Sequence, residues 1–287
     1  MTAQRTKLEK AFSLFTLKPW WRGVPTKLIR KTTLVESSCA INSPEYSTSS
    51  SRLCVQTLTF EIPKGHQFSG LSIPHNDIRL DYGDVIKVVV PNYKPKSYSL
   101  SDFRPEKNEM DITVKIYPNG RSSGYLYNMK IGEYMNSFGM SGGRSRNAGK
   151  FFGGIAYGVG ITEILPVAEA ELKKGDAEKV VILWACKTFA DTFWSDRIKG
   201  MKKEYGNKFE IVYIYSREDS SDPTILKGRI NPKVLKDVFE PRIKKANISS
   251  SEVRFLAVGT KHMIRMTQKM LSSIGYPMSK HLLLPRM

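Results

Sequence analysis

The sequence has few of the residues that build disulfide frameworks and metal sites. Its 287 residues include 3 cysteines and 4 histidines. Cys39, Cys54 and Cys186 are far apart and lack CxxC spacing, so neither a disulfide scaffold nor a zinc site is expected. The histidines show no metal-ligand spacing either. This composition predicts a protein of a reducing, intracellular compartment that holds no metal.

Long hydrophobic runs are also absent. The longest nearly unbroken apolar stretches are 151–161 and 180–186, and both are shorter than the roughly 20 residues that cross a bilayer. No transmembrane helix is therefore expected. The chain is long enough for two domains, each with its own core.

Acidic residues are scarce relative to basic ones. The 27 Asp and Glu residues are outnumbered by 45 Lys and Arg residues, which gives a formal net charge of +18. Such a charge favours acidic partners, whether an anionic membrane, a nucleic acid or an acidic protein surface. The basic residues are spread along the chain and the aromatic residues form no RNA-binding sheet signature, so nucleic acid is not an expected partner.

Residues 1–52 are interpreted as an extension ahead of the folded domains. Leu8, Ala11, Phe12 and Phe15 recur at helical spacing among basic residues, which predicts a basic amphipathic helix. Two roles fit this helix. It is either a mitochondrial transit segment or a docking element for an acidic protein, a larger assembly or an anionic membrane. Residues 36–52 are rich in Ser and Thr and predict a linker.

The remaining chain shows two patterns, with a change at residue 150. Residues 53–149 consist of short apolar runs between Pro, Gly and Asn turns, which predicts an antiparallel β-barrel. Residues 150–287 alternate strands and helices, which predicts a Rossmann-like parallel sheet with flanking helices. The expected barrel strands are 53–62, 84–90, 96–100, 111–117 and 134–138, with a short helix at 121–129. The expected sheet strands are 151–156, 180–185, 210–215 and 254–258, with helices at 164–173, 192–205 and 263–274.

Three short motifs lie at strand ends or helix starts. Lys96-Ser97-Tyr98-Ser99 lies on a barrel strand, and Gly120-Arg121-Ser122-Ser123-Gly124-Tyr125-Leu126 opens the short helix. Gly158-Val159-Gly160-Ile161-Thr162-Glu163 follows the strand at 151–156. Free backbone N–H groups at a helix start favour an anion, and glycines in such a turn let a pyrophosphate approach. The second and third motifs therefore predict phosphate contacts.

The order of these motifs resembles the ferredoxin-NADP reductase superfamily, and within it the cytochrome b5 reductase branch. The resemblance covers about residues 50–287 and includes Asp111-Ile112-Thr113-Val114-Lys115-Ile116-Tyr117, which is similar to the branch's flavin-flanking strand. It implies an FAD-binding-type barrel followed by an NAD(P)-binding-type α/β domain. The implied cofactors are FAD and NADPH or NADH.

The resemblance also implies roles for individual residues. Tyr98 would pack on the flavin ring and Ser99 would hydrogen-bond near its reactive nitrogen, which makes these two the candidate catalytic residues. Lys96 replaces the family's Arg at the pyrophosphate and keeps the charge but not the bidentate fork. The other flavin-binding candidates are Lys115, Gly120, Ser122 and Ser123. The candidates for the nicotinamide nucleotide are Gly158, Gly160, Thr162, Ser216, Arg217 and Gly259.

Several cofactor positions depart from the family's pattern. Val159 replaces a Thr near flavin and nicotinamide, Val258 lacks a thiol beside the nicotinamide, and Glu163 replaces the Pro that starts the helix. A carboxylate at Glu163 suits the helix dipole but would repel an incoming phosphate. The chain also ends without the aromatic residue that the family often places near the flavin.

Two functions therefore fit the sequence. The first is an FAD-dependent NAD(P)H oxidoreductase that passes electrons to a one-electron carrier, such as a small haem or iron–sulfur protein. The second is a reductase fold that has lost catalysis and serves as a structural subunit of a large assembly, such as a mitochondrial one. Ser216 and Arg217, with Lys227 and Arg229 nearby, favour NADPH because they would give charge-assisted hydrogen bonds to a 2′-phosphate.

Overall fold

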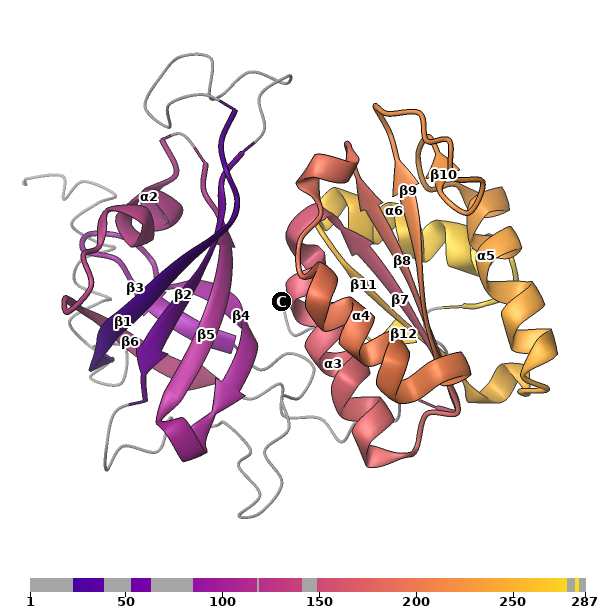
Figure 1. Ribbon diagram of the computed structural model, residues 1–287, viewed down its shortest axis with the longest axis horizontal. Helices are drawn as coiled ribbons and strands as arrows, with labels where there is room; N and C mark the ends of the chain where they lie inside the picture. Colours follow the sequence, from indigo (N-terminus) through magenta and orange to yellow (C-terminus); the bar gives the residue numbers. More distant parts are fainter. Residues whose placement is uncertain are drawn as a thin grey trace, which may run out of the picture.

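The computed structural model describes residues 23–38, 53–62, 85–117, 119–140, 149–277 and 282–283. These residues form an antiparallel barrel and a parallel sheet with helices, which lie side by side in Figure 1. The predicted fold class is confirmed. Within the described part of the chain, every helix is too short or too polar to span a bilayer.

Six of the described strands close the barrel in the order β1-β2-β5-β4-β3-β6. Leu28, Leu58 and Ile112, from three of these strands, are fully buried inside it. The strand β3 alternates buried and half-buried residues, as the two faces of a strand require. The strands are β1 (Val24–Val35), β2 (Val55–Glu61), β3 (Val85–Val89), β4 (Lys96–Arg104), β5 (Glu109–Lys115) and β6 (Tyr134–Met140), and the helix α2 (Arg121–Asn128) lies between β5 and β6.

The first strand lies inside the segment that the sequence assigned to an extension. Residues 24–27 of β1 pair with β6, and residues 28–35 pair with β2. Register shifts along β1 indicate bulges, which let one strand bend between two partners. The prediction that the barrel begins at Leu53 is therefore wrong, because β1 closes it. The predicted helix around Leu8 and most of the predicted linker lie outside the described residues.

A truncated chain that begins at Leu53 is expected to lose its folded barrel. Removing β1 exposes the pairing edges of β2 and β6 and removes the buried side chains of Leu28 and Val35. Circular dichroism during thermal unfolding would measure the loss against a control that begins at Gly23 and keeps β1. A chain from Leu53 that melts like the control would contradict this role of β1.

The second domain is a parallel sheet in the order β10-β9-β8-β7-β11-β12. Figure 1 shows α3 and α4 in front of this sheet, with α5 and α6 on the other side. The sequence missed α5, whose Asn231 caps the helix by accepting a hydrogen bond from the Val234 N–H at 2.9 Å. The strands are β7 (Phe151–Tyr157), β8 (Lys179–Cys186), β9 (Phe209–Tyr215), β10 (Leu226–Lys227), β11 (Val253–Val258) and β12 (Leu282–Leu283). The helices are α3 (Ile161–Lys174), α4 (Ser195–Tyr205), α5 (Pro232–Lys245) and α6 (Lys261–Ser273).

The strand order places a crevice at the carboxyl ends of β7 and β11. From β7 the chain first adds β8 on one side and later adds β11 on the other. Neighbouring loops therefore diverge at this point, which is where open α/β sheets bind ligands. The barrel faces this crevice, and its strand β4 packs against α3.

Candidate functional site

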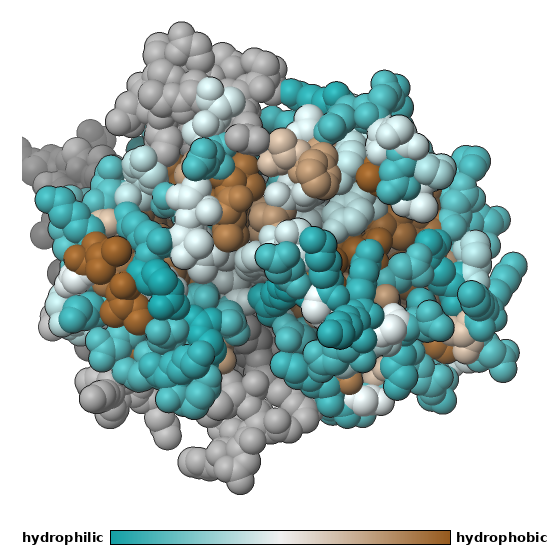
Figure 2. Space-filling view, viewed as in Figure 1, coloured by the Kyte–Doolittle hydropathy of each residue, from teal (hydrophilic) through white to brown (hydrophobic). Residues whose placement is uncertain are grey.

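A cleft of about 1610 Å³ lies between the two domains. Its walls come from β4, β5 and the start of α2 on the barrel side, and from the ends of β7, β8, β9 and β11 on the other. A single small-molecule site usually occupies about 300–1,000 Å³, so this cleft is large enough for more than one nucleotide group. Figure 2 shows that hydrophilic residues cover most of the viewed face of the molecule.

Tyr98 and Ser99 lie on β4 at the barrel wall of the cleft. Burial raises the pKa of Tyr98 to about 12, and a hydrogen bond with Ser122 partly offsets this rise. The phenol is therefore un-ionised at neutral pH. Lys96 is exposed at the start of the same strand.

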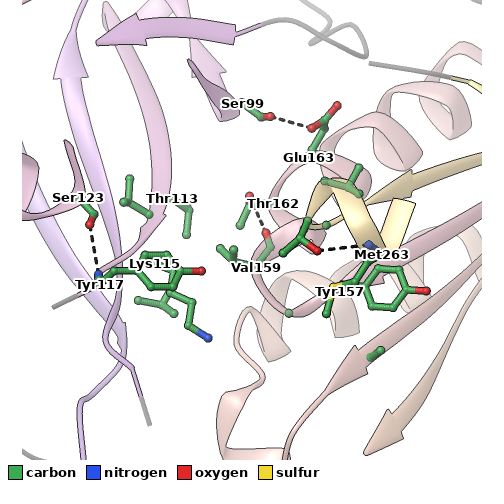
Figure 3. A pocket seen from close by; sticks show the side chains of 18 of the residues that line it. Ser99, Thr113, Lys115, Tyr117, Ser123, Tyr157, Val159, Thr162, Glu163 and Met263 are labelled. Atoms are coloured by element: carbon green, nitrogen blue, oxygen red, sulfur yellow. Dashed lines mark hydrogen bonds between the residues drawn. The ribbon is translucent and has the colours of Figure 1, made fainter. Parts of the chain in front are cut away.

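Lys115 ends β5 and extends into the space between the domains (Figure 3). Burial lowers the pKa of Lys115, and the Asp191 carboxylate across the cleft partly offsets this effect. A half-buried ammonium group at this position provides a positive charge facing the second domain. This charge suits an anionic ligand held between the two walls.

The start of α2 forms a small anion-binding cradle. Its N-cap, Gly120, provides no side-chain cap, so the first N–H groups of the helix have no side-chain acceptor there. A Cβ at Gly120 would lie 2.2 Å from Ser123 Oγ and 2.9 Å from the Tyr117 carbonyl, so only glycine fits. The buried Ser123 hydroxyl accepts a hydrogen bond from the Tyr117 N–H at 3.2 Å. The cradle is thus fixed in shape, and Ser122 lines the cleft beside it.

The turn after β7 forms the opposite wall. Gly158 has a φ of +53°, a left-handed conformation that favours glycine. Its carbonyl accepts a hydrogen bond from the indole Nε1 of the fully buried Trp184 at 2.8 Å. Thr162 donates its hydroxyl hydrogen to the Val159 carbonyl at 2.9 Å. Side chains from beneath and within the turn therefore hold it rigid.

Ser216 and Arg217 follow β9 and also line the cleft. The Arg217 N–H donates to the Lys187 carbonyl at 2.9 Å, which joins the ends of β9 and β8. Lys227 forms an ion pair with Asp219, whereas Arg229 is exposed on the cleft wall. Of the basic residues predicted to favour NADPH, Arg217 and Arg229 are therefore the better placed.

A direct bond connects the two walls. Ser99 Oγ donates to Glu163 Oε2 at 2.8 Å, from the barrel to the first turn of α3 (Figure 3). Glu163 is 9% exposed. From the sequence, this carboxylate is expected to suit the helix dipole but to repel an incoming phosphate. The structure shows that it binds the hydroxyl expected to face the flavin.

Every catalytic or cofactor-binding candidate predicted from the sequence lines this one cleft. Of the two basic residues expected nearby, Arg229 lines it and Lys227 does not. Sequence reasoning missed several other lining residues, among them Tyr157, Lys187 and Asp191. Tyr157 ends β7, and Lys187 and Asp191 come after β8. Their positions at the carboxyl ends of adjacent parallel strands were therefore the available signal. Cys186 also lines the cleft, but burial raises the pKa of its thiol to about 12, so it is not a reactive thiolate. Among the described residues, no cluster of His, Cys, Asp and Glu is placed to hold a metal ion.

The barrel, the parallel sheet and their shared cleft define a two-domain, nucleotide-binding type of protein. Two family models match the chain: the oxidoreductase FAD-binding domain over residues 57–144 and the oxidoreductase NAD-binding domain over residues 155–269. Two curated proteins named NADH-cytochrome b5 reductase 1 are similar in sequence. That of Arabidopsis thaliana is 26% identical over 226 residues, which is 77% of this chain and 75% of the relative. That of Debaryomyces hansenii is 28% identical over 225 residues, with 77% and 74% covered.

A solved structure supports the same fold. The cytochrome b5 reductase domain of Ulva prolifera nitrate reductase matches with a TM-score of 0.69 at 16% identity, covering 91% of this chain and 96% of that one. The chain belongs to the ferredoxin-NADP reductase superfamily, with an FAD-binding domain followed by an NAD-binding domain. These domains imply FAD and NAD(P)H as cofactors.

The residues present fit these cofactors. The cradle at Gly120 has the geometry to hold an anion, and Tyr98 supplies an aromatic ring on the cleft wall. The rigid Gly158 turn and the charges of Lys115 and Arg217 suit a second anionic ligand on the facing wall. The replacement of Arg by Lys96 keeps a positive charge on the barrel side.

Proposed function

We propose that this protein is an FAD-dependent oxidoreductase that takes electrons from a nicotinamide coenzyme and passes them to a one-electron carrier protein. One observation carries the proposal: two glycine-containing turns at helix starts, at Gly120 and Gly158, open into the same cleft from opposite domains. Such an arrangement holds two nucleotides with their reactive parts close together, which lowers the entropic cost of reaction. When bound, the flavin supplies the conversion of two-electron to one-electron chemistry.

The protein's own residues would position the two ligands. Tyr98 would pack against the flavin ring, while Lys96, Ser122 and Ser123 would hold its phosphates at the start of α2. Gly158, Gly160 and Thr162 would shape the turn under the coenzyme, and Gly259 leaves room for the neighbouring Tyr157 side chain. Lys115 would contribute positive charge between the two ligands. Two relatives are named as reductases of cytochrome b5, so a small haem protein is the proposed type of acceptor.

NADPH is the proposed coenzyme, although the named relatives use NADH according to their names. Arg217 and Arg229 lie on the wall beyond β9, where both would be able to bind a 2′-phosphate. A charge-assisted hydrogen bond contributes on the order of 1.5–3 kcal/mol. Because Arg229 is exposed, we expect it to raise the preference for NADPH over NADH only about tenfold, which corresponds to about 1.4 kcal/mol.

The proposal is tested by flavin content and by reduction kinetics. The purified protein should show flavin absorbance at about 380 and 450 nm, and Tyr98→Ala should lower flavin occupancy without unfolding the barrel. Tyr134→Ala is a matched control because this exposed tyrosine lies away from the cleft lining.

Stopped-flow mixing should show faster flavin reduction by NADPH than by NADH. Arg229→Gln should remove most of that preference, and Lys236→Gln on α5 should not. A flavin-free protein that does not bind added FAD would refute the proposal.

A second function, a reductase fold without turnover, is favoured by the bond between Ser99 and Glu163. This bond already engages the hydroxyl expected at the flavin, and Val159 and Val258 line the cleft where the family has polar groups. For the oxidoreductase proposed first, the same features predict slow flavin reduction. Val159→Thr combined with Val258→Cys should raise the rate of flavin reduction. Flavin that neither coenzyme reduces, before or after these changes, would favour the structural role.

A further inference from the structure

We propose that the exposed side of α6 is a docking surface for an acidic protein with an apolar patch at its centre. The surface, here called the α6 face, consists of a methionine stripe and a basic stripe: Met263, Met266, Met270, Lys261, Arg265 and Lys269. The helix attaches to the sheet through its opposite side, where Thr267 and Leu271 are fully buried. The proposal does not depend on turnover in the cleft.

The methionine stripe is unusually exposed for a helix that packs on a sheet. Met263 is 39% exposed and Met266 is 42% exposed, and Met270, one turn further, is partly exposed. Residues three and four apart lie on the same side of a helix, so these thioethers form one continuous apolar strip. Methionine is flexible and polarizable, which lets such a strip adapt to differently shaped apolar surfaces.

The basic stripe runs directly beside the methionine stripe. Lys261, Arg265 and Lys269 follow at intervals of four residues, and all three are exposed. The helix carries no acidic residue, and none of the ion pairs found among the described residues involves these three side chains. Their charges are therefore available to a partner.

The other exposed helices of this domain differ from α6. On α4 Lys199 lies 3.9 Å from Asp196, and on α5 Lys233 is paired with Asp237 at 2.5 Å. Neither helix carries an exposed large apolar residue among those described. Both helices also carry exposed lysines outside the ion pairs found among the described residues, such as Lys202 and Lys236, so positive charge alone does not set α6 apart. What sets it apart is the exposed methionine stripe beside its positive charge.

The composition of the α6 face favours a protein over other acidic partners. Single-stranded nucleic acid is usually held by aromatic side chains that stack on bases, and α6 has no Phe, Tyr or Trp. Helices that bind membranes insert large residues such as Trp, Phe or Leu, whereas only methionines are exposed here. Interfaces commonly pair an apolar centre containing Met with a charged rim, and charge complementarity then sets orientation and association rate.

The α6 face adjoins the rim of the cleft. Met263, Met266 and Met270 also contribute to the cleft wall. The Tyr157 hydroxyl, at the end of β7, shares a hydrogen bond of 2.7 Å with Thr267 Oγ1. At the start of the helix, Thr260 Oγ1 accepts from the Met263 N–H at 3.3 Å. These bonds fix the position of α6 relative to the end of β7, so a partner docked on the α6 face would lie beside the cleft.

Binding of a designed probe would test the proposal. The probe is a fluorescent helical peptide of about 15 residues with Leu on one side and Glu on the other, and its affinity is measured by fluorescence anisotropy at about 0.05 M and 0.3 M salt. We expect binding that weakens at high salt. K261E/R265E/K269E should weaken binding at least about tenfold, and M263S/M266S should weaken it without changing the salt dependence. K236E/K244E/K245E, an equal charge change on exposed residues of α5, should bind within about twofold of the unchanged protein.

Three results would overturn the proposal: no binding of the peptide, equal binding by the α6 and α5 variants, or stronger α6-dependent binding of phosphatidylserine vesicles or of a uridine oligonucleotide. Circular dichroism checks that each variant is folded. If K261E/R265E/K269E does not fold, K261Q/R265Q/K269Q decides, since it removes the charges without reversing them. The assay uses no coenzyme, so its failure would leave the proposed oxidoreductase function standing, and failure of flavin reduction would leave this surface standing.

Discussion

Replacing Trp184 with alanine is expected to lower the free energy of unfolding by about 3–5 kcal/mol, the usual cost of removing a large buried aromatic side chain. Trp184 is fully buried in β8 and packs edge-on against Phe193 with ring centroids 5.4 Å apart. Its indole also donates to the Gly158 carbonyl. The alanine variant should therefore lose both core packing and the support of the nucleotide turn.

A matched variant, Trp184→Phe, separates these two contributions. Phenylalanine keeps most of the apolar volume but leaves the Gly158 carbonyl without its donor, which we expect to cost about 1–3 kcal/mol. Chemical denaturation of both variants measures the difference. Coenzyme affinity should fall in the phenylalanine variant, because the Gly158 turn is less firmly held. Equal losses of stability in the two variants would show that packing contributes little.

Replacing Gly160 with asparagine is expected to lower the free energy of unfolding by about 3 kcal/mol, at the upper end of the cost of overpacking. The backbone of Gly160 is ordinary, with a φ of −59°. The glycine is needed because a Cβ would lie 2.4 Å from the Val258 carbonyl oxygen. The substitution must push the ends of β7 and β11 apart, which also distorts the cleft.

The same substitution at Gly158 provides the control. Gly158 has a positive φ, but no atom lies within 4 Å of a Cβ built there. Asparagine tolerates this left-handed conformation better than most residues, so the expected loss is only about 1 kcal/mol. Urea denaturation of the two variants compares them directly. A larger loss at Gly158 than at Gly160 would mean that backbone conformation, and not the contact with β11, makes glycine necessary in this turn.

The parts of the fold that depend on local pattern were predictable. The apolar run of β7 followed by Gly158 and Gly160 gave both the strand and the turn, because a parallel strand buried on both faces reads as a continuous apolar segment. The short barrel strands β3 to β6 were placed within a few residues, since Pro, Gly and Asn separate them. The motif residues also converge on one cleft, as strand ends do in both domains.

The parts that depend on distant partners were not predictable. The strand β1 is rich in Lys, Arg and Thr, so its sequence lacks a clear apolar pattern, and only pairing with β2 and β6 defines it. The bond between Ser99 and Glu163 joins residues 64 apart in sequence, and nothing near Glu163 indicates a barrel hydroxyl as its partner. The methionine stripe on α6 resembles a core stripe in sequence, and only its exposure shows otherwise.

The apolar core does not stop at the boundary between the domains. Val35 and Val55 of the barrel belong to the same buried cluster as α3 and the front face of the sheet, and Arg197 of α4 donates to the Ser101 carbonyl of β4 at 3.1 Å. Folding cooperativity therefore extends across the whole described chain, so heating should produce one unfolding transition and not two. For the same reason, neither domain can be exchanged independently. In a chimera, the new domain would have to carry the apolar residues that the original domain contributes to the shared core.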